Sequence, residues 1–176
     1  MKEPVFELKL AVAEQIKKFT VGGGFLFSMC SGTDSYDIAL SASGVDICEQ
    51  MYDGDAADPQ AQSKLNFNNT FAFENFYLKM NPMEYEYSTI DATPIHTRTP
   101  ENSDLFSLFE FSAKWDPVPT MLCQNHTRVI KGFMGQTTAY YKQYVKPGVT
   151  ILGESKSLGS VKYIHGTIGK GQWTFY

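Results

Sequence analysis

The sequence predicts an α/β fold, and three observations carry this prediction. An amphipathic helix over residues 4–20 leads into a short apolar strand over 25–29, and a second helix over 31–42 follows at once. Two further strands, 161–165 and 172–176, alternate polar and apolar residues. A helix that packs beside the strand it feeds is half of a βαβ unit. The 176 residues, 43% hydrophobic and 19% charged, are enough for one domain with a real core.

The first helix is indicated by apolar residues at helical spacing, opposite a face of lysines and a glutamate. Pro4 is tolerated in a first helical turn, and Gly22 is a natural helix stop. The apolar set is Leu8, Ala11, Val12, Ile16 and Phe19.

The second feature is a cysteine placed between the strand over 25–29 and the helix over 31–42. A strand, a sharp turn and a helix with a nucleophile at the turn outline a nucleophile elbow, and Cys30 occupies that place. Such a turn is crowded, so the residues two before and two after the nucleophile must be small; here they are Ser28 and Gly32.

The start of the helix over 31–42 adds two candidate residues. The backbone N–H of Ser31 would point to where an oxyanion could lie. Asp34 can open the helix, and we place it with Ser28 and Gly32 among the substrate-binding candidates. A cysteine that follows an apolar strand is also a common core residue, so both roles of Cys30 stay open.

A reactive cysteine needs a base, and the sequence offers three histidines. His126 is the candidate, because it follows the end of a short apolar stretch over 121–123. His165 alternates with its neighbours on a strand, which predicts a packing or edge residue, and His96 lies in a loop flanked by prolines. Cys123 and His126 also have the spacing of two metal ligands, but two ligands do not make a zinc site.

Composition excludes several classes of function. A net charge of −4 without a basic run argues against nucleic acid as a partner. No apolar stretch reaches the roughly 20 residues that cross a bilayer. Three widely separated cysteines do not form a disulfide framework. We predict no cofactor, and the acidic stretch over 53–58 favours a solvated loop over a calcium site. Compartment and oligomeric state stay open.

The rest of the chain completes the predicted organisation. A short helix over 45–51 precedes a loop over 52–70, and residues 66–112 predict an antiparallel β-rich insert. Residues 149–153 form a β-branched buried strand. The strands over 161–165 and 172–176 form a hairpin around a glycine-rich turn.

Residues 22–31 resemble the elbow strand of class I glutamine amidotransferase-like domains. More closely, the chain resembles a Bacteroidota family labelled asparagine synthetase B. The closing hairpin also resembles that of trehalose-utilisation-type (ThuA-like) amidotransferase-like proteins. The likeness covers nearly the whole chain, and the stretches that carry it are 23–40, 115–122, 124–127, 131–138 and 165–176.

The resemblance implies a three-layer flavodoxin-like sandwich with Cys30 at the nucleophile position. It places the histidine partner in a Gly-His-Asp stretch after the closing hairpin, so we expect an incomplete domain that lacks this turn and the first strands. Two features depart from the family: Ser28 stands where working enzymes have glycine, and no paired His and Glu is visible. Asparagine synthesis would also need an ATP-dependent domain, and the sequence has no phosphate-binding loop for one.

Two functions follow from these observations. In the first, Cys30 attacks a small-molecule amide such as glutamine, and ammonia is released or transferred. In the second, the chain is an inactive binding or structural domain on the same fold. Aromatic residues in its middle would then form an interaction surface, a carbohydrate-binding platform or simply core: Phe71, Phe73, Phe76, Tyr77, Tyr85 and Tyr87.

Overall fold

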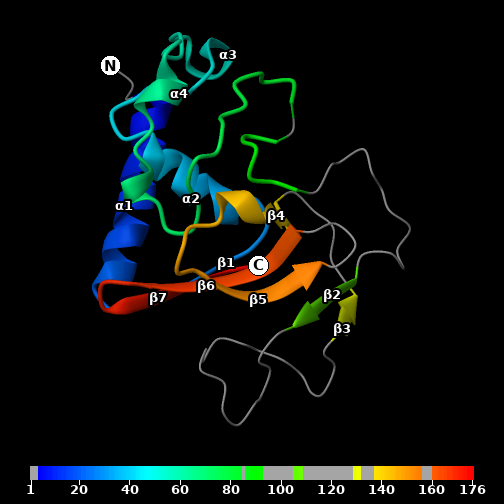
Figure 1. Ribbon diagram of the computed structural model, residues 1–176. Helices are drawn as coiled ribbons and strands as arrows, with labels where there is room; N and C mark the ends of the chain where they lie inside the picture. The colour runs from blue at the N-terminus through cyan, green and yellow to red at the C-terminus, as the bar shows by residue number, and fades with distance from the viewer. Residues whose placement is uncertain (1–3, 85, 93–104, 109–128, 132–136, 156–159) are drawn as a thin grey trace.

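The computed structural model describes residues 4–84, 86–92, 105–108, 129–131, 137–155 and 160–176. Within these ranges, seven strands form one mixed sheet, and helices pack against it (Figure 1). The predicted α/β class is therefore confirmed. The three-layer flavodoxin-like arrangement stays a prediction.

The sheet has one parallel pair, and its other pairs are antiparallel. The parallel pair is β1 with β7, which places β1 at the edge of the described sheet. In spatial order the strands are β1 (Phe25–Ser28), β7 (Gly171–Phe175), β6 (Ser160–Ile168), β5 (Thr150–Ser155), β2 (Leu105–Leu108) and β3 (Val129–Lys131), and β4 (Tyr140–Tyr141) pairs with β6.

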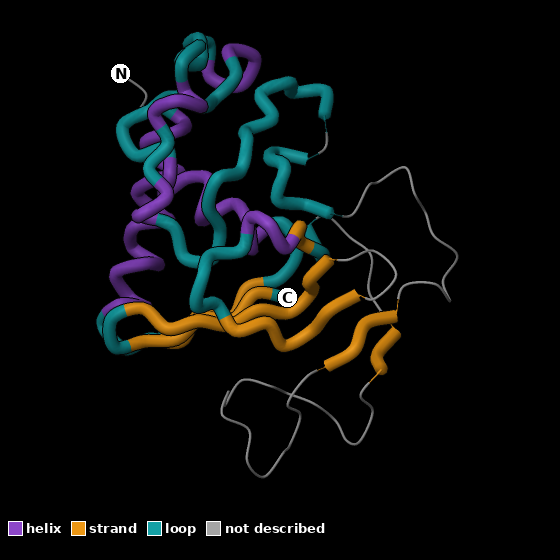
Figure 2. Tube along the Cα trace, in the orientation of Figure 1, coloured by secondary structure: helices purple, strands orange, loops and turns teal. Residues whose placement is uncertain are grey.

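The two longer helices, α1 (Val5–Val21) and α2 (Gly32–Ser41), lie on the same side of the sheet (Figure 1). Figure 2 shows that the loops after α2 are layered on this side as well. The short helices in this layer are α3 (Gln50–Asp53), α4 (Ala61–Lys64), η1 (Phe67–Asn69) and η2 (Lys142–Tyr144). The predicted helices over 4–20 and 31–42 are thus confirmed.

The core lies between the sheet and the helices. Alternation along β7 directs Trp173 and Phe175 into it, where the ring of Phe71 packs edge-on against both at 6.3 and 6.1 Å. On β1 the same alternation leaves Phe25 and Phe27 pointing away from this core, 44% and 43% exposed. The helix-facing side of the sheet is therefore buried, whereas its β1 edge keeps an apolar surface.

The predicted closing hairpin is confirmed. Its turn is hydrogen-bonded to the end of α1 and packs closely against it. β6 and β7 pair antiparallel around a turn in which Gly169 has a φ of +58°. The backbone N–H of Lys170 donates to the carbonyl of Val21 at 2.9 Å. A Cβ on Gly171 would lie 1.8 Å from the carbonyl oxygen of Thr20, so only glycine permits this approach.

The short helix predicted over 45–51 was misplaced. The helix begins at Gln50, because the Asp46 carboxylate accepts the backbone N–H of Cys48 at 2.8 Å and holds a turn there. The loop predicted over 52–70 contains two further short helices.

The predicted β-rich insert over 66–112 also differs from the structure. Its described residues 70–92 form isolated antiparallel bridges rather than strands, and one regular strand, β2, follows at 105–108. The physical reason lies partly in α2: the buried Asp37 carboxylate accepts the backbone N–H groups of residues 71–73 at 2.5, 2.7 and 2.8 Å. A side chain thus satisfies donors that a strand partner would otherwise bind.

Candidate functional site

Cys30 lies in a tight turn between β1 and α2. Its φ is +57°, in the left-handed region that residues other than glycine rarely adopt. The N–H of Gly32 donates to the carbonyl of Met29 at 3.2 Å, and the N–H of Thr33 donates to that of Cys30 at 2.9 Å. The chain thus has the strand, turn and helix that the sequence predicts, and a catalytic role of Cys30 stays a prediction.

The residues two before and two after Cys30 lie close together, with no room for a larger side chain at Gly32. Ser28 is buried at the end of β1, and a Cβ on Gly32 would lie 2.8 Å from its Oγ. The turn is also held by the end of the sheet: the N–H of Tyr176 donates to the carbonyl of Ser28 at 2.9 Å, and the N–H of Cys30 donates to that of Tyr176 at 3.1 Å. The expected need for small residues at these two positions follows from this crowding.

Ser31 occupies the N-cap position of α2. Its carbonyl accepts hydrogen bonds from the backbone and side chain of Ser35. Its own N–H donates to no residue in the described ranges. The Cys30 thiol is free and half-buried. The geometry therefore brings Cys30, Ser31, Ser28 and Gly32 together in one turn.

Behind the turn, Thr33 connects α2 to a segment more than a hundred residues later in the chain. The hydroxyl of Thr33 donates to the carbonyl of Cys30 at 2.8 Å and lies 3.3 Å from the carbonyl oxygen of Thr137. The N–H of Thr137 in turn donates to a carboxylate oxygen of Asp91 at 2.7 Å. This network fixes the turn against two distant segments.

Asp34 lies in the first turn of α2, but it is buried, with 1% of its surface exposed. The pKa of its carboxyl is raised to about 7, chiefly by burial and, after burial, by the charge of Asp91. The nearby Thr137 hydroxyl opposes the shift in part. At neutral pH, therefore, this carboxyl exists in both its protonated and its ionised form. The sequence placed Asp34 in this helix but not in the interior.

Tyr140, on β4, completes a buried polar cluster with Asp34, Asp91 and Thr137. Its ring is fully buried, and its backbone lies opposite Asp91 in an antiparallel bridge. Burial raises the pKa of its hydroxyl, and so do the charges of Asp34 and Asp91 and the thiol of Cys30. In the described part of the chain, three oxygens of this cluster have no hydrogen-bond partner: Asp34 Oδ1, Thr137 Oγ1 and Tyr140 Oη.

Four residues of this network carry no signal in the sequence: Thr33, Asp91, Thr137 and Tyr140. No motif could have found them, because 46 residues separate Asp91 from Thr137, and 104 separate Thr33 from Thr137. Their proximity depends on the fold of the sheet.

The other candidates lie elsewhere. His126, His96 and Cys123 fall outside the described residues. His165 is buried on β6 with its Nδ1 3.1 Å from the hydroxyl of Thr174, which makes it a packing residue rather than an edge residue. Burial raises the pKa of the Cys48 thiol to about 11, so it is a poor nucleophile at neutral pH.

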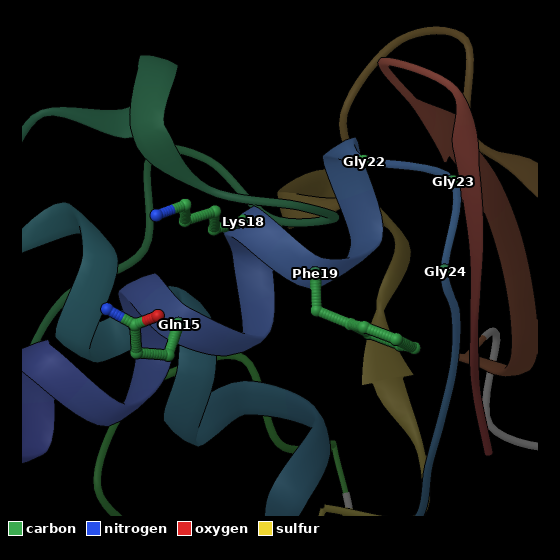
Figure 3. A pocket seen from close by; sticks show the side chains of 6 residues that line it. All are labelled: Gln15, Lys18, Phe19, Gly22, Gly23 and Gly24. Atoms are coloured by element: carbon green, nitrogen blue, oxygen red, sulfur yellow. The ribbon is translucent and has the colours of Figure 1, made fainter.

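An open depression of about 700 Å³ lies at the other end of β1 from Cys30 (Figure 3). The Phe19 side chain extends from α1 toward the strand, and a Cβ on Gly24 would come within 2.3 Å of its ring. The depression contains none of the predicted site residues. It is lined by Gln15, Lys18, Phe19, Gly22, Gly23 and Gly24.

Comparisons of this chain with protein-family models, with curated proteins and with solved structures found no match. The helices in the described ranges are too short or too polar to span a bilayer. Those ranges also contain no group of three or more His, Cys, Asp or Glu side chains arranged to hold a metal ion.

Proposed function

We propose that this chain is a glutamine amidotransferase-like protein in which Cys30 attacks the carbonyl carbon of a small-molecule amide. The observation that carries the proposal is the left-handed backbone of Cys30, φ +57°, between β1 and α2. A residue with a Cβ is held in this conformation at a free-energy cost, and such strain concentrates at functional sites. The proposal includes the three-layer flavodoxin-like fold, with which the parallel pair β1–β7 is compatible.

In the proposed reaction the Cys30 thiolate adds to the amide carbon, and the carbonyl oxygen becomes an oxyanion. In this proposal the N–H of Ser31 binds that oxyanion; the role is supported by the finding that this N–H donates to no residue in the described ranges. The intermediate collapses, the C–N bond breaks, and the nitrogen leaves as ammonia after taking up a proton. Water then hydrolyses the thioester and frees the thiol.

The proton of the thiol must go to a base. In this proposal the base is a histidine, and His126 is the candidate within the sequence. The half-buried position of Cys30 supports a reacting thiol over a core residue.

The test combines labelling with turnover. We expect a diazoketone analogue of glutamine to label Cys30, identified by peptide mass spectrometry, and we expect glutamine or a related amide to release ammonia. Cys30→Ala should abolish both, whereas Cys48→Ala, the matched change at the other described free cysteine, should abolish neither. If the analogue does not label Cys30 and no amide is hydrolysed, the proposal is overturned.

A binding or structural domain is the second candidate, and one observation favours it. Phe25, Phe27 and Met29 are 44%, 43% and 58% exposed along the β1 edge, which is an unusual density of exposed apolar side chains. The aromatic residues considered as a carbohydrate platform give it less support, because Phe71, Phe73 and Phe76 belong to the core. Under this candidate, Cys30→Ala would leave the function intact.

A further inference from the structure

We propose that two copies of this chain associate edge to edge through β1, so that the sheet of one copy continues into the sheet of the other. The surface consists of the open edge of β1 and the exposed apolar side chains along it, Phe25, Phe27 and Met29. The inference goes beyond the proposed function, because it assigns a partner to this surface and requires no reaction at Cys30.

The first step of the argument is the direction of the backbone groups of β1. Among the described strands, β1 pairs with β7 alone and lies at the end of the sheet. On the side of β7, the carbonyls of Gly24 and Ser28 accept backbone N–H groups at 3.1 and 2.9 Å. Because these groups alternate in direction along a strand, the N–H and C=O of Phe25 and Phe27 point to the open edge.

The second step is the chemistry of this edge. Edge strands commonly carry a charge, a proline or a bulge that prevents further pairing. The register of β1 on β7 is regular, and residues 19–33 contain no proline and no charged side chain. The occupant that fits is therefore an uncharged strand edge with apolar side chains. β1 of a second copy has this chemistry.

The third step is a register in which β1 matches itself. The N–H of Gly23 already donates to a carbonyl of α1 at 3.0 Å, and the carbonyl of Met29 accepts an N–H of α2 at 3.2 Å. The backbone groups that face the open edge within β1 are those of Phe25 and Phe27. An antiparallel pair that uses all of them sets Phe25 opposite Phe27 of the second copy.

This register is symmetric, as a two-fold interface requires. Leu26 lies at the two-fold axis, opposite Leu26 of the second copy. Phe25 and Phe27 form aromatic cross-strand pairs with their counterparts on the face of the sheet that points away from the core, and such pairs stabilise antiparallel strands. Pairing thus covers apolar side chains that are exposed in a single copy.

The same register brings α1 of one copy beside the Cys30 turn of the other. The Phe19 side chain extends from α1 toward the strand and lies over Gly24 (Figure 3). Gly24 is opposite Ser28 of the second copy, two residues before its Cys30. Facing strands are about 5 Å apart, so Phe19 of one copy forms a wall beside the half-buried thiol of the other.

Sedimentation velocity over a range of protein concentrations tests the association. We expect a concentration-dependent dimer, and we expect Phe27→Lys to raise its Kd about a hundredfold, because both copies lose an aromatic pair and gain a charge at the edge. Met83→Lys, the matched change on an exposed methionine outside β1, should leave the Kd unchanged. A monomer at every concentration, or a Kd that Phe27→Lys does not change, would overturn the proposal.

A second variant keeps this test decisive if Phe27→Lys fails to fold. Phe25→Pro removes an N–H that faces the open edge and no hydrogen bond to β7, so the sheet of each copy is kept and the pairing of the two copies is weakened. A dimer as tight as that of the unmodified chain would contradict strand pairing through this edge.

Cross-linking tests the register. Leu26→Cys places two thiols opposite each other at a non-hydrogen-bonded pair, where the Cα atoms are about 4.5 Å apart and a disulfide can form. In Phe27→Cys the two thiols lie diagonally, with Cα atoms about 7–8 Å apart, beyond the reach of a disulfide. Under mild oxidation we expect a covalent dimer with Leu26→Cys alone. Cross-linking through Phe27→Cys instead would overturn this register.

The rate at which N-ethylmaleimide labels Cys30, followed at its peptide by mass spectrometry, tests the position of Phe19. We expect labelling to be several-fold slower above the Kd than below it, and Phe19→Ala to remove this difference while the dimer persists. A rate that does not depend on protein concentration would overturn the contact.

These measurements need no amide substrate, so this inference and the proposed function fail separately. A dimer through β1 without amide hydrolysis would leave this inference standing. Amide hydrolysis by a chain that stays monomeric would overturn this inference alone.

Discussion

The Ser28 side chain lies over Gly32 across the turn that carries Cys30, so that a Cβ added to Gly32 would lie 2.8 Å from Ser28 Oγ. We expect Gly32→Ala to lower the free energy of unfolding by about 1 kcal/mol through this crowding. Ser28→Ala removes the oxygen and should recover most of that loss. Alanine at position 32 has the same helix propensity whether position 28 is serine or alanine. The difference between the effects of Gly32→Ala in these two backgrounds, measured by urea unfolding, therefore reports the crowding alone. If the two substitutions changed the free energy of unfolding additively, the predicted crowding between positions 28 and 32 would be contradicted.

The backbone of Cys30 supplies a second prediction. At a φ of +57°, glycine is unstrained, whereas alanine pays roughly 1 kcal/mol. We therefore expect Cys30→Gly to be more stable than Cys30→Ala by about that amount in urea unfolding. At the neighbouring Met29, which has no positive φ, the order should reverse. Equal stability of the two Cys30 variants would show that the turn relaxes in solution.

The sequence was informative where its signals were local. Three features depend on residues a few positions apart, and all three are present in the structure: the helix that ends before Gly22, the strand, turn and helix around Cys30, and the closing hairpin. The signal failed where a distant side chain decides the structure. Asp37 looks like an ordinary polar position of α2, yet it organises residues 71–73, and the polar cluster behind Cys30 forms only when the sheet assembles.

Asp34 predicts how stability changes with pH. Its pKa is about 7 in the folded chain, against 3.8 for an unperturbed aspartate, so between these values the folded state binds a proton that the unfolded state does not. Stability must therefore fall as the pH rises through this window, by an amount on the order of 4 kcal/mol. Asp37, with a pKa of about 6, adds a second decrease in stability with rising pH, which is complete at a lower pH.

The measurement is urea unfolding at several pH values between about 5 and 8. Asp34→Asn should remove most of the decrease in stability between pH 6 and pH 7, because Asp37, with a pKa of about 6, contributes the smaller part there. It should also be more stable than the unmodified chain at pH 8, since no buried charge is left. If the decrease in stability with rising pH were unchanged in Asp34→Asn, it would have to come from another titratable group.

The same substitution one turn later along α2 should have the opposite effect. Asp37 is fully buried, and its carboxylate accepts the backbone N–H groups of Phe71, Ala72 and Phe73. Asparagine has one acceptor oxygen, and its NH₂ group would face a donor. We expect Asp37→Asn to cost about 3 kcal/mol in the free energy of unfolding, the range for buried donors left without acceptors.

Hydrogen exchange locates that loss. The amides of residues 71–73 should lose protection in Asp37→Asn and keep it in Asp34→Asn, although burial raises the pKa of both carboxyls. The contrast follows from the partners: three donors converge on the carboxylate of Asp37, whereas Asp34 Oδ1 has no partner among the described residues. If both variants were destabilised alike, burial alone, rather than these partners, would govern the two sites.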